Sequence, residues 1–212
     1  MRFLCISDIH GKAEALRQVF TEAENWGYDQ VVVCGDLCFP GPDPLQVWKL
    51  LVERNALCVQ GLSDKALSRL NPERLINRFP EEQEQIERLR RTRRELGDVI
   101  VARLGQLQTV ARLPLESGHE MIVVHGSPAD ALESFTFDQS DEEMLALMGD
   151  DPADIVLCGG SHTPFQRQID ELRIIGVGSV GEAPTPGIAY ATIVTCHELS
   201  TSVEQYHVEL RE

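Results

Sequence analysis

Positive charge is the first thing that this sequence has little of. Its 212 residues include 19 Lys and Arg against 34 Asp and Glu, which gives a formal net charge of −15 at pH 7. Basic side chains cluster only between Arg88 and Arg94, with acidic residues on either side. A protein that binds nucleic acid through its overall charge needs a basic stripe. We therefore expect no stable nucleic-acid binding.

Paired cysteines and long apolar runs are also missing. The six cysteines are scattered without a CxxC pair, which is typical of buried free thiols in a reducing compartment. The chain enters a strand-like run directly after Met1, without the apolar segment of a signal peptide. No stretch approaches the roughly 20 apolar residues of a membrane span. We therefore expect a cytoplasmic protein that does not bind membranes.

Several catalytic signatures are absent too. There is no GxSxG turn, no Walker loop and no GxGxxG motif that opens a helix after the first strand. Glycines at GxGxxG spacing occur at 176–181, among strands and turns, and we expect them to let the backbone pass close to a site. Repeats and linkers are missing as well, so we expect a single domain over residues 1–212.

What the sequence does contain is a series of apolar, strand-like runs that polar residues follow at once. In open α/β sheets, the residues just beyond the carboxyl ends of the strands line the ligand crevice. The runs at 3–6, 31–34, 56–59, 120–124 and 155–158 are followed by Asp8 and His10, by Asp36, by Gly61 to Asp64, by His125 and by His162. We therefore expect these side chains to meet at one edge of a sheet.

The segments between these runs read mostly as helices and hairpins. Apolar spacing predicts helices at 12–26, 44–54, 80–104 and 141–148, the third of them either a single helix or two. It also predicts a hairpin at 109–124 and late strands at 188–195 and 202–208. The arginines at 88–94 are best explained as an ion-paired surface. The alternative is that one of them reaches a substrate phosphate.

Taken one at a time, the strand-end side chains have ordinary explanations. An Asp after a strand often caps the next helix, and a single His is more often structural than a ligand. Together, a mixed carboxylate and imidazole set suits a divalent Mn, Fe, Zn or Ni ion. The predicted metal ligands are Asp8, His10, Asp36, His125 and His162. The other histidines, His119, His197 and His207, do not follow predicted strands, and we expect them to be ordinary surface or sheet residues.

The ordered motifs resemble those of the calcineurin-like metallophosphoesterase family, and most closely its small bacterial and archaeal phosphodiesterase-type members. The resemblance spans nearly the whole chain, through Asp8-Ile9-His10, Gly35-Asp36-Leu37 with Gly41-Pro42-Asp43-Pro44, Gly61-Leu62-Ser63-Asp64, His125-Gly126, Gly159 to Phe165 and Gly178 to Gly181. It implies an α/β fold, a four-layer αββα sandwich of two mixed β-sheets flanked by helices. Residues 80–104 would form a helical surface or cap region within it.

The resemblance also implies a two-metal centre and assigns a role to each predicted ligand. Asp8, His10 and His162 would bind the first metal, Asp36 would bridge, and His125 would serve the second. Asp36 and His125 are then the predicted catalytic residues. The cations would bind phosphate oxygens, lower the pKa of a bridging water and stabilise the charge on the attacking and leaving oxygens.

Two motifs depart from the family pattern, both on one side of the predicted centre. The third motif usually carries Asn and His where this chain has Leu62 and Ser63. The fifth usually carries a further His where this chain has Gly160. We therefore expect one firmly bound metal and a weak second one. Compensating ligands would have to come from Ser63, Asp64 or Ser161.

Two functions remain open from the sequence. The first is a metal-dependent phosphoesterase that hydrolyses a small-molecule phosphomonoester or phosphodiester with metal-activated water. The second is a non-catalytic relative that binds a metal and a phosphate ligand as a sensor or interaction module. Ser63 at the position of the usual His favours the second function, and the complete first-site set favours the first.

Overall fold

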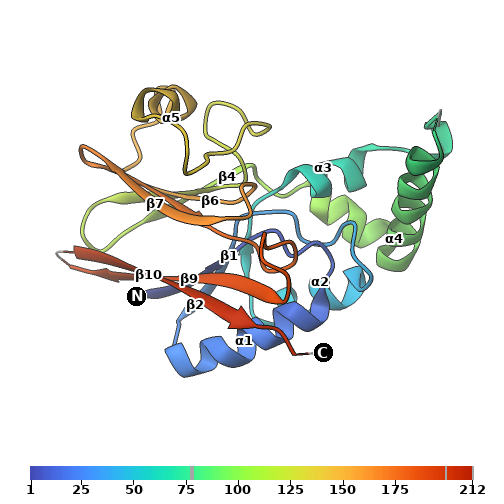
Figure 1. Ribbon diagram of the computed structural model, residues 1–212, viewed down its shortest axis with the longest axis horizontal. Helices are drawn as coiled ribbons and strands as arrows, with labels where there is room; N and C mark the ends of the chain where they lie inside the picture. The colour runs from blue at the N-terminus through green and yellow to red at the C-terminus, as the bar shows by residue number, and fades with distance from the viewer. Residues whose placement is uncertain (77–78, 199, 212) are drawn as a thin grey trace.

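Two five-stranded sheets form the centre of the computed structural model, which describes residues 1–76, 79–198 and 200–211 (Figure 1). The first sheet has the order β10 (Ser200–Glu209), β9 (Ile188–His197), β1 (Arg2–Ile6), β2 (Gln30–Val33), β3 (Leu57–Cys58). The second has the order β4 (Val110–Pro114), β5 (Glu120–Val124), β6 (Ile155–Cys158), β8 (Leu172–Val177), β7 (Pro164–Ile169). Both are mixed, because β1–β2–β3 and β5–β6–β8 are parallel and the outer pairings are antiparallel.

The apolar runs of the sequence are continuous because the central strands are buried on both faces. In β1, Leu4 and Ile6 pack toward the helices, whereas Phe3 and Cys5 pack between the sheets. In β5, Ile122 and Val124 pack against α5 (Asp141–Met148), whereas Met121 and Val123 face the other sheet. Three apolar cores therefore separate four layers, which confirms the predicted αββα sandwich.

Helices cover both outer faces. Figure 1 shows α1 (Ala13–Trp26) below the first sheet and α5 above the second. The helices α2 (Pro44–Glu53), α3 (Leu62–Arg69) and α4 (Pro80–Gly105) and the short 3-10 helix η1 (Pro72–Arg74) complete the helical side of the first sheet. None of the helices in the described part of the chain combines the length and the apolar character that a membrane span requires.

Most predicted elements are confirmed within one or two residues. The long helix α4 is divided as the sequence allowed, because Gly97 has φ 72° and ψ 163° in its interior. All six cysteines are free, and five of them are buried. Three elements were not predicted: α3, which begins directly after Gly61, the 3-10 helix η1, and β7, an edge strand of the second sheet.

The architecture brings the carboxyl ends of β1, β2, β5 and β6 to one place. Ser7, just after β1, donates its hydroxyl to the carbonyl of Cys34 after β2 (3.0 Å). A Cβ at Gly159, just after β6, would lie 2.1 Å from the same Ser7 hydroxyl. The loops that follow the parallel strands of the two sheets are therefore in direct contact, and all five predicted ligands lie on them.

Candidate metal centre

The backbone is unusual at four of the five predicted ligands. Asp8, His10, Asp36 and His162 have φ of 51°, 48°, 56° and 58°. Elsewhere in the described ranges, Asn55 and Asp170 are the only non-glycine residues with positive φ. Non-glycine residues with a left-handed backbone conformation concentrate at functional sites, where the surrounding structure supports the strain.

Hydrogen bonds between loops hold these conformations. The ladder between β1 and β2 continues beyond the strands, because Asp8 N–H donates to the carbonyl of Gly35 (3.1 Å) and His10 N–H to that of Asp36 (3.0 Å). Asp64, which is fully buried, accepts the N–H groups of Asp36 (2.9 Å), Leu37 (3.0 Å) and Gly61 (3.0 Å). The Asp36 loop is thus fixed from both sides.

Two histidine rings are locked in one tautomer. The Nδ1 of His10 lies 2.7 Å from the carbonyl of Phe39, and the Nδ1 of His125 lies 2.8 Å from the carbonyl of Cys34. A carbonyl oxygen only accepts, so each Nδ1 carries the hydrogen. In the neutral rings, each Nε2 then presents a lone pair, which is the arrangement of a metal-binding histidine.

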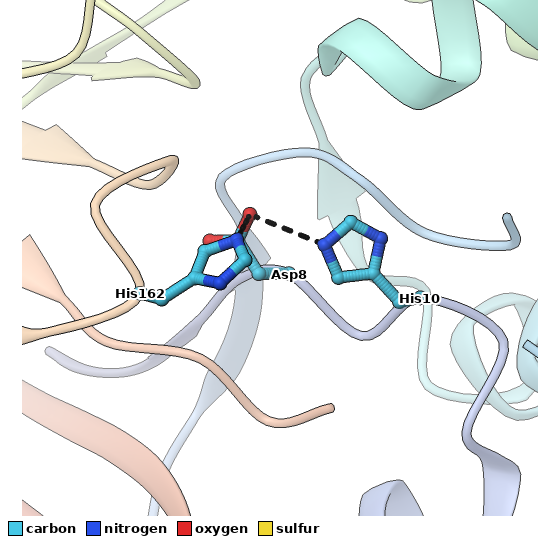
Figure 2. Close-up of side chains that lie close together, drawn as sticks. All are labelled: Asp8, His10 and His162. Carbon is cyan, nitrogen blue, oxygen red and sulfur yellow. Dashed lines mark ion pairs between the residues drawn. The ribbon is translucent and has the colours of Figure 1, made fainter. Parts of the chain in front are cut away.

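These lone pairs face carboxylate oxygens. Asp8 Oδ1 lies 3.2 Å from His162 Nε2 and 3.8 Å from His10 Nε2, as Figure 2 shows. Asp36 Oδ2 lies 3.5 Å from His125 Nε2 and 3.9 Å from His10 Nε2. Two atoms that share a metal at about 2.1 Å can be at most about 4.2 Å apart. All four distances satisfy that limit.

The five predicted ligands form two overlapping groups. In each group, one potential ligand atom per residue lies within 4.8 Å of the others: Asp8, His10 and His162 in the first, and Asp8, Asp36 and His125 in the second. Asp8 therefore belongs to both groups. Asp36 also approaches histidines of both, because its Oδ2 lies near His10 as well as His125.

The donor set fits a divalent cation. Asp8 Oδ1 and His10 Nε2 are buried and have no hydrogen-bond partner among the described residues. Buried polar atoms are normally paired, and an ion is one explanation where they are not. Ionised carboxylates and imidazole lone pairs are all acceptors, and a cation satisfies them together. A mixed nitrogen and oxygen set of this kind suits Zn, Mn, Fe or Ni.

Electrostatics inside the cluster are strong. Burial by itself raises the pKa of the Asp8 carboxyl, but the close approach of His162 (Nε2 at 3.2 Å from Oδ1) and the charges of His125 and His162 outweigh it, so the net pKa lies below the ordinary value. The close approach of the Asp8 carboxylate raises the pKa of His162. Burial and the negative charge of Asp36 raise the pKa of Asp64 to about 6.

The three candidate compensating residues have different surroundings. Both oxygens of Asp64 are occupied by backbone N–H groups, and Ser161 donates its hydroxyl to the carbonyl of Thr163 (3.1 Å). Ser63 donates its backbone N–H to Asp36 Oδ1 (2.8 Å), while its own hydroxyl is buried without a partner among the described residues. Of the three, only Ser63 has a side chain that makes no hydrogen bond with the described residues.

Leu62 and Gly160, which replace the family's usual Asn and His, have no side-chain atom that can bind a metal. Leu62 begins α3 and is 37% exposed. Gly160 has φ +71°, and a Cβ there would lie 2.2 Å from the hydroxyl of Ser134. Its N–H donates to Asp8 Oδ2 (3.0 Å), so the glycine contributes a backbone contact to the centre.

Sequence reasoning missed one carboxylate at the centre. Glu182 Oε2 lies 3.6 Å from His10 Nε2. The available signal was its position directly after the glycine turn at 178–181, which was expected to approach the site. In the arginine cluster, Arg88 pairs with Glu84 and Arg90 with Glu73 and Glu87, as expected of an ion-paired surface. Arg93 donates instead to the backbone carbonyls of Leu67 and Leu70. His119, His197 and His207 are exposed.

Three solved structures show where this fold occurs. A hypothetical protein from Pyrococcus horikoshii OT3 has a TM-score of 0.83 at 20% identity, and the match covers 100% of this chain and 89% of that one. A metallophosphoesterase from Sphaerobacter thermophilus has a TM-score of 0.78 at 22% identity, with the same coverage of 100% and 89%. Wild-type Vps29 from Entamoeba histolytica, complexed with Zn²⁺, has a TM-score of 0.54 at 15% identity and full coverage of both chains (100%).

At these identities, likeness to solved structures shows the fold alone. A search of curated protein sequences gave no significant match. The sequence itself, however, matches the profile of the calcineurin-like phosphoesterase superfamily domain over residues 1–198. This match covers nearly all of the 212 residues and includes every predicted ligand. The chain therefore belongs to the calcineurin-like phosphoesterase superfamily.

Proposed function

We propose that the protein is a metal-dependent phosphoesterase that hydrolyses a small-molecule phosphomonoester or phosphodiester. The observation that carries this proposal is the convergence of acceptor atoms on one point. Asp8 Oδ1 and His10 Nε2 are buried, lie 3.8 Å apart and have no hydrogen-bond partner among the residues described. A divalent cation would satisfy such a centre, and the superfamily supports the reaction class.

In this proposal, the first metal is held by Asp8, His10, His162 and Asp36, and the second by Asp36, His125 and Asp8. When bound, the divalent cations supply Lewis-acid chemistry, which polarises the phosphoryl group and lowers the pKa of a water. The chain orients this chemistry. Phe39 and Cys34 fix two imidazole rings through their carbonyls, and Ser63 N–H holds one oxygen of Asp36.

The two metal positions differ in strength under this proposal. The first has two imidazoles and two carboxylates, of which Asp8 is entirely buried. The second position has no metal-binding side chain at Leu62 or Gly160, so a phosphate oxygen of the substrate would have to supply the missing ligand. We therefore propose one firmly bound transition metal (Mn, Fe, Zn or Ni) and a second that substrate recruits.

The remaining assignments are proposals of the same kind. A net charge of −15 disfavours a nucleic-acid substrate, so a small phosphoester is the proposed substrate. Free thiols at all six cysteines are compatible with a cytoplasmic location. Residues 1–212 would act as one domain, in which helix α4 would be a helical surface or cap region.

A second candidate is a non-catalytic protein that binds a metal and a phosphate ligand as a sensor or interaction module. The residues that favour it are Leu62, Ser63 and Gly160. A hydroxyl at Ser63 is a far weaker proton donor than imidazolium at neutral pH. A centre that binds phosphate but cannot assist the leaving group would be a receptor rather than an enzyme.

Metal content and hydrolysis distinguish the two candidates. Purified protein is analysed for Mn, Fe, Zn and Ni, then assayed with phosphomonoesters and phosphodiesters in the presence of added Mn²⁺. We expect hydrolysis in the wild type and in Asp150→Asn, an exposed control. We expect Asp36→Asn to lose at least about 100-fold, because it removes a charged ligand of both metals. A metal-loaded wild type that hydrolyses no substrate would support the second candidate instead.

A further inference from the structure

The loop between β8 and β9 is fastened to the loop that carries Asp8 and His10. Gly181 N–H donates to the carbonyl of Asp8 (2.9 Å), and the hydroxyl of Ser179 donates to the same carbonyl (2.9 Å). A Cβ at Gly181 would lie 2.2 Å from the carbonyl of Ile9, so the two backbones approach as closely as glycine allows. Glu182 is the next residue.

The peptide group between Gly181 and Glu182 is hydrogen-bonded at both its N–H and its carbonyl. Its N–H donates to the hydroxyl of Ser179 (2.6 Å), which itself contacts the Asp8 carbonyl. The carbonyl of Gly181, directly before it, accepts a hydrogen bond from Lys12 Nζ (2.6 Å) at the start of α1. The position of Glu182 relative to His10 is therefore set by the fold, whereas its side chain extends to the solvent side and is 38% exposed.

Glu182 provides the nearest carboxylate oxygen to His10 Nε2. Its Oε2 lies at 3.6 Å, compared with 3.8 Å for Asp8 and 3.9 Å for Asp36. None of these distances is a hydrogen bond. Since Nδ1 of His10 donates to Phe39, the neutral ring presents a lone pair to three carboxylates. These atoms are all acceptors, and a cation bound between them would satisfy all of them.

We infer that Glu182 is an additional ligand of the metal that Asp8, His10 and His162 hold, and that it closes the solvent side of that ion. The 3.6 Å separation from His10 lies within the limit of about 4.2 Å for two ligands of one metal. Glu182 is not among the residues whose ligand atoms all lie within 4.8 Å of one another, so its carboxylate has to move toward Asp8 and His162 to bind the same ion. An exposed carboxylate can move to the ion by side-chain rotation, without a change in the fastened backbone. This inference rests on the metal site of the proposed function but not on hydrolysis.

The test compares Glu182→Gln with Glu171→Gln, an exposed glutamate in the turn between β7 and β8. Mn²⁺ is titrated calorimetrically into metal-free protein. We expect the Kd of Glu182→Gln to rise about 10- to 100-fold, the range for supporting groups at metal sites. We expect Glu171→Gln to match the wild type. The visible absorption of bound Co²⁺ should change only in Glu182→Gln, because its intensity depends on the number of ligands.

The outcomes separate this inference from the proposed function. Equal Kd values in both variants would overturn the role of Glu182 while leaving the metal site intact. A weaker Kd with an unchanged Co²⁺ spectrum would also overturn it, since that result indicates a charge effect without ligation. Tight Mn²⁺ binding that depends on Glu182 in a protein without hydrolytic activity would support the inference and contradict the enzyme. A wild type that binds neither ion would overturn both.

Discussion

Gly160 is one of the two positions at which the second half of the centre has no side-chain ligand. At this position, a side chain is disfavoured by steric crowding. A Cβ there would lie 2.2 Å from the hydroxyl of Ser134, and the backbone has φ +71°. The same residue donates its N–H to Asp8. The loop is thus shaped around a glycine, and a histidine at this position would require Ser134 and the backbone to move. The incomplete second site is therefore built into the loop.

A matched pair of alanine variants tests this explanation. Gly187→Ala introduces a Cβ at φ +76° into open space, so it should cost about 1–2 kcal/mol of unfolding free energy from the left-handed backbone alone. Gly160→Ala adds the crowding at Ser134, and we expect a further loss of about 1–3 kcal/mol. Urea denaturation of the metal-free proteins gives both values. Equal losses would show that the loop at Gly160 relaxes freely.

At the scale of elements, the sequence predicted strands and helices well where one physical signal dominated. Runs such as 31–34 and 155–158 are strands buried on both faces, and apolar continuity is enough to find them. The edge strand β7 was missed because only Phe165 and Ile169 are buried in it, at a spacing typical of a helix. Its alternation is hidden at Arg167, whose guanidinium binds Asp141 and nearby carbonyls.

Helix α3 was missed for a different reason. It has eight residues and begins at Leu62, without a side chain that accepts a hydrogen bond at the preceding Gly61. Its N-terminal end is organised by tertiary contacts instead, through the bonds of Asp64 to the Asp36 loop. A contact between residues that far apart in the chain leaves no mark on local periodicity. The hydrogen bonds of Asp64 to the backbone of Asp36 and Leu37 could not be predicted for the same reason.

Helix α5 shows the opposite case, because local signals define its start. Ser140 accepts the N–H of Glu143, and the Glu143 carboxylate accepts the N–H of Ser140 (2.8 Å). We expect Ser140→Ala to lower the unfolding free energy by about 1 kcal/mol, the usual contribution of an N-cap. Ser202→Ala, at an exposed position of β10, should change it by less than about 0.5 kcal/mol. Equal unfolding midpoints for the two variants would contradict a stabilising cap.

At the scale of the whole molecule, the centre lies where two sheets meet. Asp8 and Asp36 follow strands of the first sheet, and His125 and His162 follow strands of the second. Periodicity predicted that each strand end carries polar residues, but the pairing of the sheets followed only from the resemblance of the ordered motifs. Without a cation, acceptor atoms of these side chains face one another. A cation at this point would bind them together and so join the two sheets.

Metal binding should therefore stabilise the entire fold. With free Mn²⁺ at 100 times its Kd, we expect the unfolding free energy to rise by about 2.7 kcal/mol, because the unfolded chain has no preformed site. Asp8→Asn should lose most of this increase, since Asp8 is common to both groups of ligands. Asp150→Asn, an exposed control, should keep it. Urea denaturation with and without Mn²⁺ measures each increase.

The increase should also depend on pH, with a sign that His162 determines. The Asp8 carboxylate at 3.2 Å raises the pKa of His162 above its ordinary value of 6.5, so a proton competes with the metal for Nε2 at a higher pH than in an ordinary histidine. In the metal-free protein, the protonated pair contributes stability that is fully present below 6.5 and is lost as the pH rises through the raised pKa. Both effects make the Mn²⁺-dependent increase smaller near pH 6 than near pH 8. An increase that is equal at both pH values and in Asp8→Asn would instead indicate Mn²⁺ bound to the acidic surface.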